Sequence, residues 1–191
     1  MNEPPRIRVF CVDDHPLLRE GIITLINNQP DMQVVGEAST GQKAIEGFRE
    51  HRPDIALMDI RLPDMSGIDV MIAIRKEFPE ARIIMLTTSE GDVEIQRALE
   101  AGASGYMLKS MPPKEVVEAV RQVNRGKKRI PPEIAAHIAD LTESLHRSDV
   151  TGLLTAADHA QIEAANSWMD QARLFGQGAL QAAACVARGL M

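Results

Sequence analysis

Polar residues whose side chains could take part in a reaction follow four of the five short apolar runs in the first two thirds of the sequence. They are Asp13, Asp14, Asp59, Thr87 and Lys109. If the three carboxylates converge, they repel one another unless a cation or a proton offsets their charge. Mg²⁺ is the natural partner, because it is a hard cation that prefers oxygen ligands. A metal ion, a carboxylate nucleophile and a lysine ammonium together describe a phosphoryl-transfer site.

These residues converge only if the apolar runs are parallel strands of one sheet. The predicted strands are residues 7–12, 33–37, 55–58, 83–86 and 105–108. Stretches of helical period separate them, which is typical of alternating strand and helix units. The predicted helices begin at Pro16, cover 41–51, 67–78 and 92–101, and run from Pro113 to a stop at Gly126.

Five such units in roughly 120 residues predict a doubly wound α/β fold, with a flavodoxin-like five-stranded parallel sheet in the order 2-1-3-4-5. The second strand is the most polar, so we expect it at an edge. Ligands of such sheets bind beyond the carboxyl ends of the strands, beside strand 1. One aspartate after a strand is usually a turn residue or a helix N-cap. Polar groups at four strand ends together indicate a site.

The composition and net charge of the chain argue against some classes of protein. The chain has 191 residues, of which 45% are hydrophobic and 3% aromatic, and its net charge is −6. That charge argues against a protein whose main role is to bind a nucleic-acid backbone, although it allows a small basic patch. Two cysteines without metal-ligand spacing indicate a reduced compartment. With no apparent signal peptide or membrane span, we expect a soluble cytoplasmic protein without a membrane partner.

Four motifs carry a family resemblance. They are Val12-Asp13-Asp14-His15-Pro16, Asp59-Ile60-Arg61-Leu62-Pro63-Asp64-Met65-Ser66-Gly67, Met85-Leu86-Thr87, and Ala101-Gly102-Ala103-Ser104-Gly105-Tyr106-Met107-Leu108-Lys109. With them, residues 7 to about 126 resemble a response-regulator receiver (CheY-like) domain of two-component signalling. The sequence Asp-His-Pro near the start and Ser110 after Lys109 resemble the NarL/FixJ subfamily, whose members usually end in a LuxR-type helix-turn-helix module.

The resemblance implies a role for each carboxylate. Asp59 would accept a phosphoryl group from a phosphohistidine of a sensor histidine kinase. Asp14 and Asp59 would bind Mg²⁺ with the backbone carbonyl of Arg61, and Asp13 would contribute through a water molecule. No glycine-rich phosphate loop follows the first strand, which disfavours a flavodoxin-like nucleotide-binding enzyme.

The resemblance also implies a switch. Lys109 would pair with the phosphoryl oxygens, the Thr87 hydroxyl would move toward one of them, and Tyr106 would swing inward into the vacated space. From the residues alone, the alternative is that Tyr106 is simply a half-buried aromatic on an edge strand. We expect a homodimer on phosphorylation. Neither Arg61 nor Ser89 is a carboxylate that could orient a hydrolytic water, so we expect slow dephosphorylation and no enzymatic activity on other molecules.

The end of the chain departs from the family. The predicted organisation is a receiver domain over 1–126, a linker and linker helix over 127–145, and a small Ala-rich all-helical extension over 146–191. Residues 141–191 hold three basic side chains against five acidic ones. That balance disfavours DNA binding and favours output through a protein contact. LuxR-type DNA binding remains the alternative function. The extension is either a truncated or altered helix-turn-helix or a native alternative tail.

Overall fold

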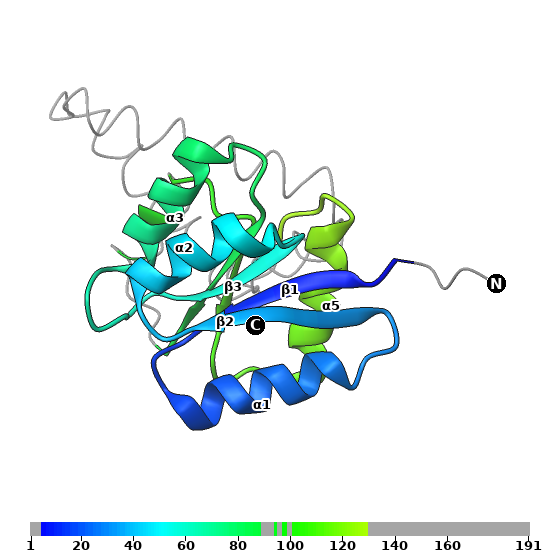
Figure 1. Ribbon diagram of the computed structural model, residues 1–191. Helices are drawn as coiled ribbons and strands as arrows, with labels where there is room; N and C mark the ends of the chain where they lie inside the picture. Colours follow the sequence, from blue (N-terminus) through cyan, green and yellow to red (C-terminus); the bar gives the residue numbers. More distant parts are fainter. Residues whose placement is uncertain (1–4, 89–93, 95–96, 99–100, 130–191) are drawn as a thin grey trace, which may run out of the picture. The chain divides into compact units, whose positions relative to one another are not determined.

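A computed structural model describes residues 5–88, 94, 97–98 and 101–129 (Figure 1). Contacts within the chain divide it into two units: residues 1–89 with 103–129, and residues 90–102 with 130–191. The first unit contains the whole described sheet. Among the described residues, no helix is long and apolar enough to cross a membrane.

The sheet has five parallel strands in the order β2-β1-β3-β4-β5, which confirms the predicted topology. The strands are β1 (Ile7–Val12), β2 (Met32–Ala38), β3 (Ile55–Asp59), β4 (Ile83–Thr87) and β5 (Gly105–Leu108). β2 lies at an edge, as predicted. It is one residue longer at each end than the prediction, because Met32 pairs with Ile7 and Ala38 pairs with Val12.

Helices cover both faces of the sheet, and this explains the continuous apolar strands. β3 and β4 are buried along their full lengths. Because side chains alternate between the two faces of a strand, Val9 and Cys11 of β1 join the core cluster that includes Ile26 of α1 and Val120 of α5. The helices α2 and α3 pack against each other, and α2 also contacts β1 and β2 (Figure 1).

The helices begin where the sequence provides a start signal. They are α1 (Pro16–Asn27), α2 (Gly41–His51), α3 (Gly67–Glu77) and α5 (Pro113–Asn124). Proline stands in the first turn of α1 and of α5, where its missing N–H costs nothing. Thr40 and Ser66 cap α2 and α3 through their side-chain oxygens. The predicted bounds of α2 are confirmed, whereas α3 ends one residue early because Phe78 is its C-cap.

Three predicted segments lie wholly or mostly outside the described residues. In the predicted helix 92–101, Glu94, Arg97 and Ala98 are helical, and the Ala101 N–H donates to the Arg97 carbonyl at 3.0 Å. The linker helix and the extension 146–191 are not described. Their helical character therefore stays a prediction.

The carboxylate of Asp64 connects the loop after β3 to the start of α2. It accepts hydrogen bonds from the backbone N–H groups of Gly41 at 2.7 Å and Gln42 at 2.9 Å. These are two of the N–H groups that a helix leaves without intrahelical partners. The hydrogen bond from Gln42, followed by the one from Gly41, lowers the pKa of Asp64. Asp64 thus holds the loop and the helix start together.

We therefore expect Asp64→Ala to lower the melting temperature by a few degrees, whereas Glu20→Ala, at an exposed position on α1, should leave it nearly unchanged. Because the pKa of Asp64 is depressed on folding, its stabilisation is complete above the ordinary aspartate pKa of about 4 and is lost as the pH falls through the folded value. Thermal melts from pH 7 to pH 3 should show the gap between wild type and Asp64→Ala closing in acid. A constant gap would contradict this role.

Candidate phosphoryl-transfer site

The fold brings the predicted site residues to one edge of the sheet. Asp59 and Thr87 are the last residues of β3 and β4, and Lys109 directly follows β5. Asp13 directly follows β1, and its N–H donates to the Ala38 carbonyl at 3.1 Å. Parallel strands have their carboxyl ends at the same edge, so residues that are distant in the sequence lie close together in space. Within the described part of the chain, the buried polar or charged residues are Asp13, Asp59 and Thr87.

Lys109 links two of the carboxylates. Its Nζ lies 2.8 Å from Oδ2 of Asp13 and 2.7 Å from Oδ2 of Asp59. The Lys109 side chain is 8% exposed, and those of Asp13 and Asp59 are 0% and 4% exposed. Ion pairs between such buried groups are screened little by solvent. One ammonium therefore neutralises part of the charge of two buried carboxylates.

Burial and pairing oppose each other in the pKa values of this pair. Burial raises the pKa of Asp59, and the hydrogen bond from Lys109 opposes that rise without cancelling it. Burial acts to lower the pKa of Lys109, but its hydrogen bonds with Asp13 and Asp59 outweigh this and raise the pKa overall. Lys109 is therefore held as a cation beside Asp59.

Asp14 and His15 complete the acidic cluster on its solvent side. One ligand atom from each of Asp13, Asp14, His15 and Asp59 lies within 4.8 Å of the others. Nδ1 of His15 lies 2.7 Å from Oδ1 of Asp14, and these side chains are 73% and 34% exposed. Three carboxylates against one ammonium leave an excess of negative charge. This donor set fits a hard divalent cation such as Mg²⁺.

The loop after β3 shapes the site around Asp59. Oδ1 of Asp59 accepts a hydrogen bond from the Arg61 N–H at 3.1 Å, which places the Arg61 backbone beside the carboxylate. The Gly67 N–H donates to the Ile60 carbonyl at 2.8 Å. A Cβ on Gly67 would overlap the backbone carbonyl of Asp59. The loop can close this tightly only because residue 67 has no side chain.

Thr87 and Tyr106 lie in the interior. Thr87 is 1% exposed, and its carbonyl accepts the Lys109 N–H at 2.6 Å, which ties the end of β4 to the residue after β5. Tyr106 is 0% exposed, although β5 is an edge strand. The half-buried alternative for Tyr106 is therefore wrong, because the side chain is fully buried. Alternation with Met107, which belongs to the α1 and α5 core, places Tyr106 on the opposite face.

Sequence reasoning missed two neighbours of the carboxylates. His15 was noted only as part of a motif, and its nearness to Asp14 follows from its position just before Pro16. Arg19 donates to the Asp13 carbonyl at 2.7 Å and to Glu37 at 3.0 Å. Arg19 is one helical turn after His15, and that spacing was the available signal. The Arg19 guanidinium thus ties the backbone of Asp13 to α1.

Residues 9–121 match the response regulator receiver domain family. That match covers more than half of the chain, and the strand order and the acidic strand ends agree with it. The chain therefore belongs to the response regulator receiver family, and it is a response regulator of two-component signalling. The receiver is of the NarL/FixJ type.

Named relatives support this subfamily. The response regulator VraR of Staphylococcus aureus is 37% identical over 158 residues, which cover 79% of this chain and 76% of the relative. A LuxR-family response regulator from an Aurantimonas species superposes with a TM-score of 0.68 and 41% identity, covering 71% of this chain and 96% of that one. The signal receiver domain of the response regulator NarL from Mycobacterium tuberculosis superposes with a TM-score of 0.63 and 36% identity. The match covers 65% of this chain and 100% of that one.

Proposed function

We propose that Asp59 is the phosphoacceptor of this response regulator. The observation that carries the proposal is the buried Asp59 carboxylate at the end of β3, 2.7 Å from the Lys109 ammonium and next to two further aspartates. A phosphoryl acceptor needs an ionised oxygen and nearby positive charge for the oxygens of the incoming group. Lys109 supplies such a charge, and its other partner, Asp13, holds it in place.

Asp13, Asp14 and Asp59 are proposed to hold Mg²⁺ with the backbone carbonyl of Arg61. When bound, the ion neutralises charge on the carboxylates and on the phosphoryl oxygens. The proposal is supported by the close approach of the three carboxylates and by the placement of Arg61 through its N–H bond to Asp59. Asp14 is the most exposed of the three carboxylates, and it leaves the site open to solvent on that side.

In the proposed step, a carboxylate oxygen of Asp59 forms a bond to phosphorus. The bond from phosphorus to the donor breaks, and the leaving group takes that electron pair. The donor is a phosphohistidine of a sensor histidine kinase, so the leaving group is an imidazole. Lys109 stays close to Asp59 and pairs with the transferred oxygens. The product carries a new dianionic group where a single carboxylate stood.

Thr87 and Tyr106 are proposed to change position in response to the phosphoryl group on Asp59. The Thr87 hydroxyl turns toward the new group, and the repacking passes to Tyr106 on β5. We infer that the altered face forms a homodimer in the phosphorylated state, in the cytoplasm. Dephosphorylation is proposed to be slow because the Arg61 side chain is not a carboxylate that could orient a hydrolytic water molecule. The second position, Ser89, lies outside the described residues.

Acetyl phosphate should add one phosphoryl group to the full chain in the presence of Mg²⁺, and Asp59→Asn should abolish the addition. The reason is that an amide oxygen is a far weaker nucleophile than an ionised carboxylate. Asp54→Asn, at the other end of β3, is the matched control and should be labelled like the wild type. Intact-mass measurement gives the readout. Labelling that survives in Asp59→Asn would place the acceptor elsewhere.

DNA binding through the C-terminal region is the second candidate function. The LuxR family of the solved relative from Aurantimonas favours it. The three basic and five acidic residues in 141–191 disfavour it. A mobility-shift assay with the phosphorylated chain distinguishes the two forms of output, because DNA binding through phosphate contacts must weaken as the salt concentration rises.

A further inference from the structure

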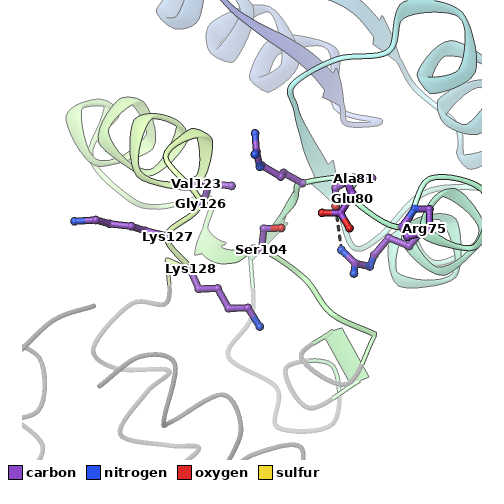
Figure 2. A pocket seen from close by; sticks show the side chains of 10 residues that line it. Arg75, Glu80, Ala81, Ser104, Val123, Gly126, Lys127 and Lys128 are labelled. Atoms are coloured by element: carbon purple, nitrogen blue, oxygen red, sulfur yellow. Dashed lines mark hydrogen bonds between the residues drawn. The ribbon is translucent and has the colours of Figure 1, made fainter. Parts of the chain in front are cut away.

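A cavity of about 310 Å³ lies at the sheet edge opposite the phosphoryl-transfer site. Its walls are the segment before β4, Ser104 just before β5, and the turn that follows α5. Figure 2 shows Ser104 between that turn, with Gly126, on one side and Arg75 with Glu80 on the other. Because the strands are parallel, their starts and ends lie at opposite edges. This cavity is therefore separate from the phosphoryl-transfer site.

The lining of the cavity is strongly basic. Its charged residues are Arg75, Arg82, Lys127, Lys128 and Glu80. Four cations and one carboxylate give a net charge of +3, in a chain whose total charge is −6. The cations come from α3, the segment before β4 and the turn after α5. Folding thus concentrates positive charge that the sequence spreads over more than fifty residues.

Most of these cations have no acidic partner within the part of the chain that the structure describes. No carboxylate there lies within ion-pair distance of Arg75, Arg82 or Lys127. Other cations do have such partners, as in the pairs Arg19–Glu37, Arg49–Glu77 and Arg121–Asp31. Among the described residues, several cations are thus paired with carboxylates, whereas Arg75, Arg82 and Lys127 lie together at this cavity without one.

Backbone hydrogen bonds fix the turn that presents the two lysines. The Lys127 N–H donates to the Gln122 carbonyl at 3.0 Å, and the Arg129 N–H donates to the Ser104 carbonyl at 3.2 Å. The Arg129 carbonyl in turn accepts the Tyr106 N–H at 2.9 Å. On the opposite wall, the Arg75 guanidinium donates to the Ala81 carbonyl at 3.0 Å (Figure 2). The walls are therefore held in place before any ligand arrives.

We propose that this cavity binds a small phosphorylated molecule with a diphosphate or triphosphate group. Its net charge of +3 matches such a group better than a single phosphate. Guanidinium groups pair with phosphate oxygens through two parallel hydrogen bonds, and Arg75 and Arg82 offer two of these groups. The volume is near the lower end of the roughly 300–1,000 Å³ found for small-molecule sites. A concave site of this size favours a small ligand over a DNA duplex.

The electrostatics of Lys128 agree with an anion site. Burial lowers the pKa of Lys128, and the nearby positive charge of Arg75 lowers it further. The positive charge of Arg75 therefore reaches the side of the cavity that carries Lys128.

Isothermal titration of the full chain with inorganic pyrophosphate, in magnesium-free buffer at fixed ionic strength, tests the proposal. We expect saturable binding of one pyrophosphate per chain. The double variant Arg82→Gln/Lys127→Gln should weaken it at least tenfold, because two of the four cations are lost. Glu80→Gln should strengthen it severalfold, because it removes the single carboxylate of the cavity.

The matched control is Lys43→Gln/Lys114→Gln, which removes the same charge at exposed positions outside the cavity and should change the affinity less than twofold. Absence of saturable binding would overturn the proposal. Equal weakening in both double variants would also overturn it, since it would show only an effect of net charge. So would salt-sensitive binding of a short DNA duplex without pyrophosphate binding, which would identify a nucleic-acid surface.

Discussion

Lys109→Met is expected to abolish detectable phosphorylation by acetyl phosphate and to lower the free energy of unfolding by about 2–3 kcal/mol in magnesium-free buffer. Methionine keeps an unbranched side chain of similar length but removes the ammonium group. Asp13 and Asp59 would then be two buried carboxylates without the cation that lies within 2.8 Å of each. The expected cost is below the roughly 3–5 kcal/mol of a fully buried pair because the site opens to water at Asp14.

A second substitution separates this electrostatic effect from lost packing. Asp13→Asn added to Lys109→Met removes one of the two uncompensated carboxylates, so it should recover part of the lost stability. Mg²⁺ should recover part of it as well. Urea unfolding of the four members of the cycle, with and without Mg²⁺, gives the coupling free energy. A Lys109→Met chain as stable as the wild type in magnesium-free buffer would show that the ion pairs contribute nothing net.

The sheet and the centre of the site could be predicted because both depend on local patterns. Continuous apolar strands that alternate with amphipathic helices define a parallel sheet. A parallel sheet then places Asp59, Thr87 and Lys109 at one edge. The convergence of residues 50 positions apart, such as Lys109 and Asp59, therefore follows from topology alone. The basic cavity lies at the opposite edge of the same sheet. It was not predicted, because the residues that line it form no recognisable sequence motif.

The missed features depend on side-chain direction and loop shape. Asp64 lies in a loop, and only the folded loop brings its carboxylate to the N–H of Gly41, 23 positions earlier. Arg19 has two partners whose positions depend on where α1 lies against the sheet. The full burial of Tyr106 could not be predicted either, because the exposure of a side chain on an edge strand depends on what packs over that strand. None of these follows from periodicity.

Gly67→Ala should destabilise the protein by about 2–3 kcal/mol, in the upper part of the range for an added methyl group in a packed interior. The reason is a close approach rather than backbone conformation, since Gly67 is not among the residues with positive φ. Its added Cβ would overlap the carbonyl oxygen of Asp59 and lie 3.2 Å from Cα of Ile60. Backbone atoms cannot rotate away as a flexible side chain does. Either the start of α3 or the phosphoacceptor itself must shift.

The same substitution at Gly21 is the control. Gly21 lies inside α1, and a Cβ there meets nothing within 4 Å. Gly21→Ala should therefore stabilise the chain by about 0.5–1 kcal/mol, because alanine loses less conformational entropy than glycine in a helix. Urea unfolding should thus give opposite signs for the two variants, and phosphorylation by acetyl phosphate should slow at least tenfold only in Gly67→Ala. Normal labelling of a stable Gly67→Ala chain would mean that the loop tolerates displacement without moving Asp59.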